Sequence, residues 1–448
     1  MSAWLQRALR LRSGELRLAL LGALAYFCVL AGYGFLRPLR ETFGVSRGMD
    51  ELRLLFAATT LASLLFVVAF GGAISRMDRR RVIPLAYGIV IVCLAGFVAL
   101  LVVDHQRGGG LVGSGTESGT ALGVAYGFYV WLSVINLFVN SVLWGFLADV
   151  FSVEQGKRVF PFIGVGGTLG ALAGSETTRQ LGQAFDGWLL PIGLMAAGAL
   201  LFLAAIGSVA WLDRSAVASH ASDLGSTSRG DARQPLGGGS WDGLLEVLRS
   251  PYLLGIGGFI VLMAVANTLI YFAQAQIVRD ATDTFSQRIA GFAQFDALAN
   301  GATLFTQLFV TSRLIRRLGV GGTLAILPLL TLAGFAVLAV WPLMGVMAIF
   351  QALHRAARYA IARPARETLF SVVPQSQKYK AKPVVDVFLY RGGDLAGMLL
   401  SKALALGGLG VAGLAIASLP LALGWGALSL GLGRAQTRRD TRGREAAS

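Results

Sequence analysis

The stretch VIPLAYGIVIVCLAGFVALLVV, residues Val82–Val103, contains no charged side chain and decides the fold class. An α-helix crosses the hydrocarbon core of a bilayer, about 30 Å thick, with roughly 20 predominantly apolar residues. In lipid the backbone must satisfy its own polar groups, so such a stretch forms a helix. Arg79, Arg80 and Arg81 precede it and Asp104 follows it, which marks the two ends of a membrane span.

Runs of similar length and composition occur on both sides of this stretch. Hydrophobic residues make up 55% of the 448 residues and charged residues 14%, against about 25% charged residues in a soluble domain. The sequence therefore predicts an all-α integral membrane protein with about twelve transmembrane helices. The predicted spans are Leu16–Leu36, Leu52–Ile74, Val82–Val103, Ala121–Ala148, Val159–Gln183, Trp188–Leu212, Leu253–Val278, Ile289–Thr311, Val320–Trp341, Leu343–Ala362, Ala381–Ala405 and Gly407–Gly431.

The spans separate into two sets of six. Residues 213–250 are rich in Ser, Gly, Asp and Arg, a composition typical of a flexible linker. We therefore expect a basic cytoplasmic N-terminus (1–15), an N-terminal six-helix bundle (16–212), a cytoplasmic linker (213–250), a C-terminal six-helix bundle (251–432) and a basic cytoplasmic tail (433–448).

Basic residues in the loops indicate the orientation, because Lys and Arg concentrate in cytoplasmic loops. They all fall on one side of the membrane if both termini are cytoplasmic, whereas the opposite loops at 104–120 and 341–342 are poor in basic residues. The residues that set this orientation are Arg76, Arg79, Arg80, Arg81, Arg313, Arg316, Arg317, Lys378, Lys380, Lys382, Arg434, Arg438, Arg439, Arg442 and Arg444.

Two short motifs repeat in register between the halves. The sequence SRMDRR at Ser75–Arg80 matches SRLIRR at Ser312–Arg317, and FSV at Phe151–Val153 matches FSV at Phe370–Val372. Each match places a span against the span six later in the same orientation. This pattern favours a parallel duplication of the major facilitator type.

Polar residues recur at helical spacing inside the apolar spans, where they are costly unless they face a cavity or a partner. We expect five such stripes around one central cavity, although Asn, Ser, Thr and Gln can also simply join helices by hydrogen bonds. The stripes are Tyr26, Tyr33, Arg37 and Arg40; Tyr129, Ser133, Asn136 and Asn140; Asn267, Tyr271 and Gln274; Asp296, Asn300, Thr303 and Gln307; and Arg355, Arg358 and Arg366.

One hexapeptide pattern occurs twice, as RPLRET at Arg37–Thr42 and as RPARET at Arg363–Thr368. Each proline can break its helix, and each arginine pair offers planar forks suited to phosphate or carboxylate. We interpret the hexapeptides as two basic clamps that flank a central anion site. The alternative is that each Arg–Glu pair only caps the end of a helix.

Other classes of function find little support. The net charge of +15 resides mainly in short loops, so it does not indicate nucleic acid, and Cys28 and Cys93 lie inside apolar runs. The Gly-rich run with Gly166, Gly170 and Gly174 lacks the strand and the Gly-Lys-Ser/Thr ending of a nucleotide loop, so we interpret it as a helix-packing face. The sequence predicts that the protein is not an enzyme and has no metal site or cofactor. It also predicts a monomer.

Three groups of segments resemble the ATP/ADP translocase (nucleotide transporter) family, a branch of the major facilitator superfamily. They are Phe35–Glu41; Trp144–Phe146 with Lys157, Arg158 and Pro161; and Lys378–Lys382 with Asp386 and Tyr390–Asp394. The resemblance implies twelve helices, exchange of ATP for ADP, basic residues that read the phosphates, and a bacterial inner membrane. The resemblance places Arg40 where family members that move nucleotides have a lysine. It places Leu132 and a position near Ile270 where those members have acidic residues. Asp394 lies near another of their lysines.

The leading interpretation is a secondary active transporter of an anionic metabolite, with nucleotides and other phosphorylated compounds among the candidates. Two alternatives stay open: a proton-coupled exporter of small organic solutes, and a membrane scaffold or sensor that transports nothing. The predicted substrate ligands are Tyr33, Arg37, Arg40, Asn136, Asn140, Asn267, Gln274, Asn300, Arg355, Arg358, Arg363 and Arg366. The predicted coupling or ion-pair residues are Glu41, Asp296, Glu367, Asp386, Arg391 and Asp394.

Overall fold

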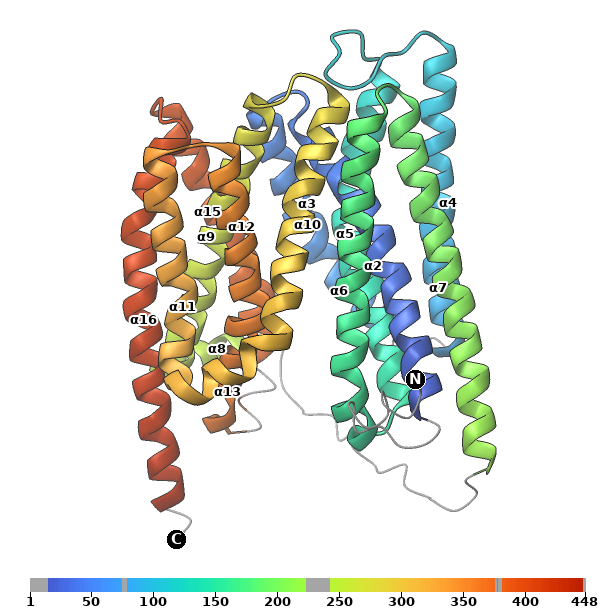
Figure 1. Ribbon diagram of the computed structural model, residues 1–448. Helices are drawn as coiled ribbons and strands as arrows, with labels where there is room; N and C mark the ends of the chain where they lie inside the picture. The colour runs from blue at the N-terminus through green and yellow to red at the C-terminus, as the bar shows by residue number, and fades with distance from the viewer. Residues whose placement is uncertain (1–14, 75–78, 223–241, 375–376, 378–380, 446–448) are drawn as a thin grey trace. The chain divides into compact units, whose positions relative to one another are not determined.

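The computed structural model describes residues 15–74, 79–222, 242–374, 377 and 381–445 (Figure 1). The helices are α2 (Glu15–Val45), α3 (Met49–Ile74), α4 (Arg79–Gln106), α5 (Gly119–Val150), α6 (Val153–Ala184), α7 (Leu189–Ser222), α8 (Asp242–Arg249), α9 (Pro251–Asp280), α10 (Phe285–Phe309), α11 (Thr311–Val340), α12 (Met344–Ala356), the π-helix η1 (Ala357–Ala362), α13 (Arg363–Leu369), the 3-10 helix η2 (Phe370–Val372), the π-helix η3 (Val384–Leu389), α15 (Tyr390–Leu406) and α16 (Val411–Glu445). Some predicted features lie outside the described residues. They are the basic N-terminus up to residue 14, residues 75–78 of the SRMDRR repeat, which include Arg76, and Lys378 and Lys380.

Contacts between elements divide the chain into two compact units. Unit 1 comprises Met1–Leu55, Leu65–Gly230 and Thr282–Asn300, as far as the structure describes them, and unit 2 comprises Phe56–Leu64, Asp231–Ala281 and Gly301–Ser448. Helix α10 therefore contributes its first part to unit 1 and its second part to unit 2. The expected division into residues 16–212 and 251–432 stays a prediction.

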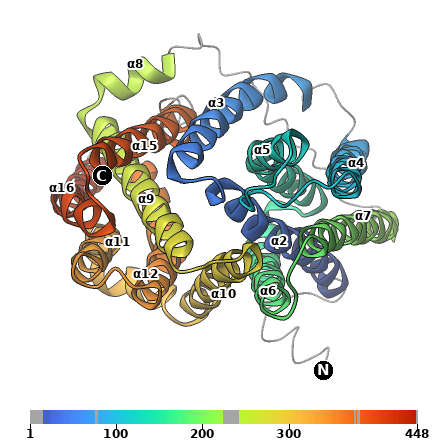
Figure 2. The ribbon, with the colours of Figure 1, turned by 90° about the horizontal axis from the view of Figure 1, so that it is seen from above.

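Helix α2 is the centre of unit 1 and packs against α5, α6 and α7 (Figure 2). The contact with α6 is close because the Gly-rich run turns its backbone toward α2. A Cβ atom at Gly166, Gly170 or Gly174 would collide with the main chain of Ala23, Phe27 or Ala31, respectively. Small residues allow this approach in lipid. The interpretation of the Gly-rich run as a packing face is confirmed.

The prediction that span one ends near Leu36, where Pro38 would break the helix, is wrong. Helix α2 continues through Pro38 to Val45. Proline lacks the N–H that would bond the carbonyl four residues earlier, at Gly34. The Thr178 hydroxyl of α6 lies 2.8 Å from the Gly174 carbonyl and 3.3 Å from the Gly34 carbonyl, so its single proton is shared between the two acceptors. A neighbouring helix thus supplies the missing donor, which allows a proline inside a membrane helix.

The side chain of the preceding residue caps the N-terminus of several helices in unit 1 and unit 2. Ser118 accepts a hydrogen bond from the Ala121 N–H at the start of α5. Ser152 and Gln155 form a capping box at the start of α6, and Ser250 caps α9 just before Pro251. Helix α7 continues to Ser222 and α8 occupies 242–249, so these parts of the predicted linker at 213–250 are helical; residues 223–241 lie outside the described residues.

In unit 2, α9 packs against α15 and α16, and α11 packs against α16 (Figure 2). The predicted loop around Arg317 is helical, and α11 kinks at Gly319, whose φ of 64° suits glycine. Two helices of this unit contain π-helical segments. The segment η1 precedes Pro364, and η3 follows Pro383, so each lies beside a residue that cannot donate a backbone hydrogen bond.

Large apolar side chains point outward from both units. Leu54, Leu65, Val92, Leu200 and Leu406 are between 66% and 80% exposed, as expected for side chains that face lipid rather than water. Seven of the described helices are long and apolar enough to cross a membrane, so the chain is a multi-pass membrane protein. They are Glu15–Val45, Ile83–Gln106, Gly119–Val150, Leu189–Ala216, Pro251–Asp280, Arg317–Val340 and Val411–Thr441.

The other five predicted spans correspond to α3, α6, α10, α12 with η1, and η3 with α15. Helices α6 and α10 carry more polar side chains, and the last two spans are interrupted by a π-helical segment. The helical, membrane-spanning fold class is confirmed, whereas the count of twelve stays a prediction.

Candidate anion-binding site

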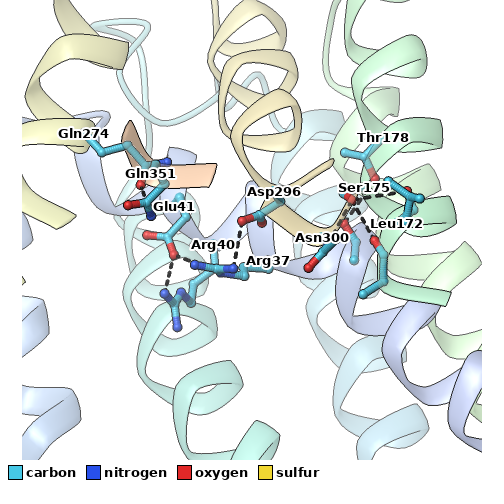
Figure 3. A network of polar contacts seen from close by, with 12 residues as sticks. Arg37, Arg40, Glu41, Leu172, Ser175, Thr178, Gln274, Asp296, Asn300 and Gln351 are labelled. Atoms are coloured by element: carbon cyan, nitrogen blue, oxygen red, sulfur yellow. Dashed lines mark hydrogen bonds and ion pairs between the residues drawn. The ribbon is translucent and has the colours of Figure 1, made fainter. Parts of the chain in front are cut away.

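An ion pair between α2 and α10 lies inside unit 1 (Figure 3). The Arg37 Nη1 atom donates to Asp296 Oδ1 at 2.7 Å, and Arg37 Nε lies 3.7 Å from Glu41 Oε1 one turn further along α2. The Arg37 side chain is 21% exposed and the Asp296 side chain 7%. Charges this well buried are expensive unless they are paired, so the pair fixes the first part of α10 against α2.

Arg40 lies one turn after Arg37 and faces α5. Its Nη1 atom donates to Ser133 Oγ at 2.9 Å, its Nη2 atom pairs with Glu41, and its guanidinium carbon lies 5.1 Å from the centre of the Tyr129 ring. Ser133 in turn donates to the Tyr129 carbonyl at 2.7 Å. The predicted stripe on α5 therefore supplies a platform that orients the Arg40 guanidinium.

The amide side chains of unit 1 have separate partners. Asn140 Nδ2 donates to the backbone and side-chain oxygens of Asn136 at 2.9 and 3.0 Å. Asn300 Nδ2 lies 3.4 Å from Ser175 Oγ on α6. Tyr33 is half-buried on α2, one turn before Arg37. These positions stay predictions as substrate ligands.

In unit 2, Arg358 lies in the π-helical segment η1. Its Nη2 atom donates to the Tyr390 hydroxyl at 2.6 Å, and its guanidinium carbon lies 5.1 Å from the Tyr359 ring centre. Tyr390 directly follows the second π-helical segment, η3. Short π-helical segments inside α-helices occur frequently at functional sites, and here the bond joins one of them to the residue that follows the other.

A buried carboxylate lies beside this pair. Asp394 Oδ2 lies 3.1 Å from Arg391 Nη1 on the same helix, and Asp394 Oδ1 accepts from the Thr268 hydroxyl of α9 at 3.3 Å. The Asp394 side chain is 7% exposed. Asp394 is thus a counter-ion of Arg391 in this conformation, one of the two roles expected for it.

A pair of buried amides joins α9 to α12. Gln351 Nε2 donates to Gln274 Oε1 at 2.9 Å (Figure 3). Gln274 belongs to the predicted stripe on α9, whereas the sequence analysis missed Gln351. The signal was present, because Gln351 lies three, four and seven residues before His354, Arg355 and Arg358 in an otherwise apolar helix.

The second hexapeptide lies in unit 2 at the start of α13. Arg366 Nη2 is 3.4 Å from Asp386 Oδ1 and 3.6 Å from Glu367 Oε1, and Lys382 Nζ is 2.6 Å from Glu367 Oε2. Arg363 is exposed. Burial opposes ionisation of Glu367, but the hydrogen bond and charge of Lys382, together with Arg366, hold its pKa below the usual value. This hexapeptide therefore forms an ion-pair cluster in which Glu367 is exposed and Arg366 is largely buried.

One basic residue of the family-like motifs has a structural partner far along the chain. Arg158 Nη2 lies 2.6 Å from Glu15 Oε1, and the Glu15 side chain is 7% exposed. This bond joins the start of α6 to the start of α2. Of the remaining predicted ligands, Arg355 is half-buried on α12 and Asn267 half-buried on α9.

Similar sequences occur among nucleotide carriers. No protein-family model matches the chain. ADP,ATP carrier protein 1 of Chlamydia trachomatis is 23% identical over 316 residues, which cover 62% of this chain and 58% of the relative. The chloroplastic ADP,ATP carrier protein 1 of Arabidopsis thaliana is 22% identical over 307 residues, which cover 62% of this chain and 48% of that protein. Over these residues the chain is similar to the ADP,ATP carrier proteins. It spans about half the length of these curated relatives.

Solved structures of transporters share the fold. An inward-facing bacterial homologue of the iron transporter ferroportin aligns with a TM-score of 0.64 and 14% identity, over 93% of this chain and 99% of its own. The nucleoside transporter NupG aligns with a TM-score of 0.56 and 14% identity, over 96% and 99%. At this identity the likeness concerns the fold alone. The expected resemblance to the ATP/ADP translocases agrees with the sequence similarity to ADP,ATP carrier proteins.

Proposed function

We propose that this relative of the ADP,ATP carriers is a secondary active transporter for an anionic metabolite, a nucleotide or another phosphorylated compound. It works by alternating access: the two halves rock about a central site that opens to one side of the membrane at a time. The proposal includes twelve spans in two six-helix bundles, with the domain limits expected from the sequence. It also includes a monomer in a bacterial inner membrane, with both termini in the cytoplasm.

The buried network of Arg37, Arg40, Glu41 and Asp296 carries this proposal. Its four side chains are between 4% and 21% exposed and lie on helices of a membrane protein. Ionisable groups at such positions are expensive and usually mark a substrate or ion pathway. Two guanidinium groups face two carboxylates, so the network is balanced in charge in this conformation. An incoming anion would compete with the carboxylates for the same N–H donors.

The chemistry of the donors supports a phosphorylated substrate. A guanidinium group presents paired N–H donors that match two oxygens of a phosphate, and it stays charged at any physiological pH. Arg40 is held by Ser133 and by the Tyr129 ring, so little rotamer freedom remains to be lost when an anion binds. The alignment with carriers named for ADP and ATP favours the same class of substrate.

Counterflow in proteoliposomes tests the proposal. Vesicles with the purified chain are preloaded with ATP, ADP, phosphate or a sugar phosphate, and uptake of the labelled compound is followed with and without a pH gradient. We expect saturable uptake that is driven by at least one of these anions and is strongly reduced in Arg40→Gln. Arg47→Gln is the matched control, because Arg47 is 38% exposed beyond the end of α2. Wild-type vesicles that accumulate none of the anions would contradict the proposal.

A further inference from the structure

The outward face of α16 changes from apolar to basic toward its C-terminal end. The apolar part contains Ile416, Leu423 and Leu430, which lie seven residues apart and are between 45% and 59% exposed, as expected for one lipid-facing stripe. The same stripe continues at four-residue spacing with Arg434 and Arg438, and both are exposed. Charged side chains are costly in hydrocarbon. The change from Leu430 to Arg434 therefore marks the edge of the hydrocarbon layer.

Helix α9 begins at the same edge. A Cβ atom at Gly258 would lie 3.5 Å from Leu428 Cδ2, and a Cβ atom at Gly255 would lie 2.9 Å from Leu432 Cδ2. The two contacts step in opposite directions along the chain, so α9 and α16 are antiparallel. Leu432 lies between the last leucine and the first arginine of the stripe. Gly255, one turn after the start of α9, is therefore level with the edge of the hydrocarbon layer.

The short helix α8 lies against this part of α9. Figure 2 shows α8 lengthwise, whereas α9 and α16 are seen nearly end-on, so α8 runs across their axes. Val247 of α8 is 1% exposed, and its side chain lies 3.9 Å from where a Cβ atom at Gly257 would be. Gly257 is two residues, about 3 Å, beyond Gly255 along α9. Helix α8 thus lies at the level where the lipid-facing stripe of α16 changes character.

The other side of α8 exposes apolar side chains. Leu245 is 46% exposed and Leu248 is 55% exposed, whereas Val247 between them faces α9. Leu254, in the first turn of α9, is 43% exposed. Arg249, the last residue of α8, is also exposed. A helix that is apolar on one face and lies in the plane of the membrane interface buries that face at the boundary between headgroups and acyl chains.

The basic end of α16 is held in place by the start of α9. The guanidinium carbon of Arg439 lies 4.5 Å from the centre of the Tyr252 ring, and the Tyr252 hydroxyl donates to the Leu369 carbonyl at 2.9 Å. Residues 434–445 contain five arginines and two acidic residues, which leaves an excess of three positive charges. The arginines of the outward stripe are therefore presented at the level of the lipid headgroups.

We propose that α8 and the outward arginines of α16 form a docking surface for anionic membrane lipids. Leu245 and Leu248 insert among the acyl chains. Arg434 and Arg438, together with Arg249, bind the phosphates of neighbouring headgroups. Basic clusters just beyond a membrane span attract anionic lipids, and a guanidinium group matches the oxygens of a phosphate. The inference goes beyond the proposed function and does not depend on which solute is moved. The proposed topology places this surface in the cytoplasmic leaflet.

Lipid binding to the purified full chain tests the arginines. Native mass spectrometry at low ionic strength compares phosphatidylglycerol, which is anionic, with phosphatidylcholine, which has no net charge. We expect the wild type to prefer phosphatidylglycerol, and Arg434→Gln/Arg438→Gln to lose about fivefold of this preference for each arginine removed. Arg107→Gln/Arg279→Gln is the matched control, because it removes two exposed arginines after α4 and at the far end of α9. An unchanged preference in Arg434→Gln/Arg438→Gln would overturn the inference.

Fluorescence quenching tests the position of α8. The chain has two cysteines, so a fluorophore can be attached to Leu248→Cys or to Thr441→Cys in a Cys28→Ala/Cys93→Ala background. Each labelled protein is placed in nanodiscs of phosphatidylcholine and phosphatidylglycerol with brominated acyl chains. Thr441 is exposed on α16, about 16 Å beyond Leu430. We expect the label at Leu248 to be quenched several-fold more strongly than the label at Thr441. Equal, weak quenching would place α8 in water, and the inference would then be wrong even with transport intact.

Discussion

The two hexapeptides RPLRET and RPARET are nearly identical in sequence but lie in different surroundings. In the first, Glu41 is 3% exposed and Arg37 pairs with Asp296, which lies 259 residues away in the chain. In the second, the Glu367 side chain is 42% exposed and Arg363 is exposed. Burial and the counter-ion, rather than the motif, therefore decide what each arginine can do.

Because the two hexapeptides differ in burial and in counter-ions, we no longer interpret them as two equivalent anion clamps. Arg37 is already engaged by a buried carboxylate, so an anion reaches it by competition. Arg366 lies in a cluster with Asp386, Glu367 and Lys382, where the Lys382 and Glu367 side chains are 35% and 42% exposed and solvent weakens their pair. The comparison predicts that equivalent substitutions have large effects in the first hexapeptide and small effects in the second.

The largest effect is expected for Asp296→Asn. This change leaves Arg37 buried without its main counter-ion, and breaking a buried pair by removing one partner costs about 3–5 kcal/mol. Asp386→Asn is the matched change in the second cluster and should cost less, because the Asp386 side chain is 28% exposed and lies 3.4 Å from Arg366, against 7% and 2.7 Å in the Asp296 pair. The apparent thermal unfolding midpoint of the purified protein measures both. Partial recovery in Arg37→Gln/Asp296→Asn would assign the loss to the unpaired charge, and equal shifts for both single variants would remove the distinction.

The next effect concerns transport in Arg40→Gln and Arg366→Gln. A hydrogen bond to a charged group contributes about 1.5–3 kcal/mol, so loss of the Arg40 donor should weaken anion binding by about 10- to 100-fold. Arg366→Gln should weaken it only a few-fold, because Arg363 and Lys382 remain nearby. The apparent KM for counterflow measures the effect, with protein yield and oligomeric profile as the folding control. A larger effect at Arg366 would reverse the proposed order.

A smaller effect is expected at Pro38 of the first hexapeptide. Thr178→Val removes the hydroxyl that donates to the Gly34 carbonyl, which Pro38 leaves without its helical partner. An unsatisfied buried carbonyl costs about 1–3 kcal/mol. Adding Pro38→Ala should recover much of this loss, since the alanine N–H can bond Gly34. Thermal unfolding of the single and double variants tests the coupling, and a Pro38→Ala change that adds to the loss would contradict it.

These features show what the sequence could and could not predict. Composition predicts the lipid-facing spans because 20-residue apolar runs depend on local sequence alone. Helical spacing also identified Arg37, Arg40 and Asp296 as members of polar stripes on their own helices. It could not find their pairing, nor the donation from Thr178 to Gly34, because both depend on contacts between residues more than 100 positions apart. The π-helical segments beside Pro364 and Pro383 leave no mark on hydropathy, so they too were missed.

The smallest effect is expected at Glu367, the exposed counterpart of Glu41. Because the pKa of Glu367 is lowered in the folded protein, its ion pairs stabilise the fold above the ordinary pKa of a glutamate and lose this contribution as the pH falls through the lowered value. Between pH 8 and pH 5 the stabilisation is therefore constant. A half-exposed pair of this kind contributes about 0–1 kcal/mol, and salt screens it.

Glu367→Gln should therefore lower the apparent unfolding midpoint slightly and by the same amount throughout pH 5–8. The difference from the wild type should close only in more acidic solution, and it should shrink when salt is added. Unfolding scans over pH at two ionic strengths measure these trends. A pH-dependent difference near neutrality would show that Glu367 titrates there, and the second hexapeptide would then be as strongly coupled to its surroundings as the first.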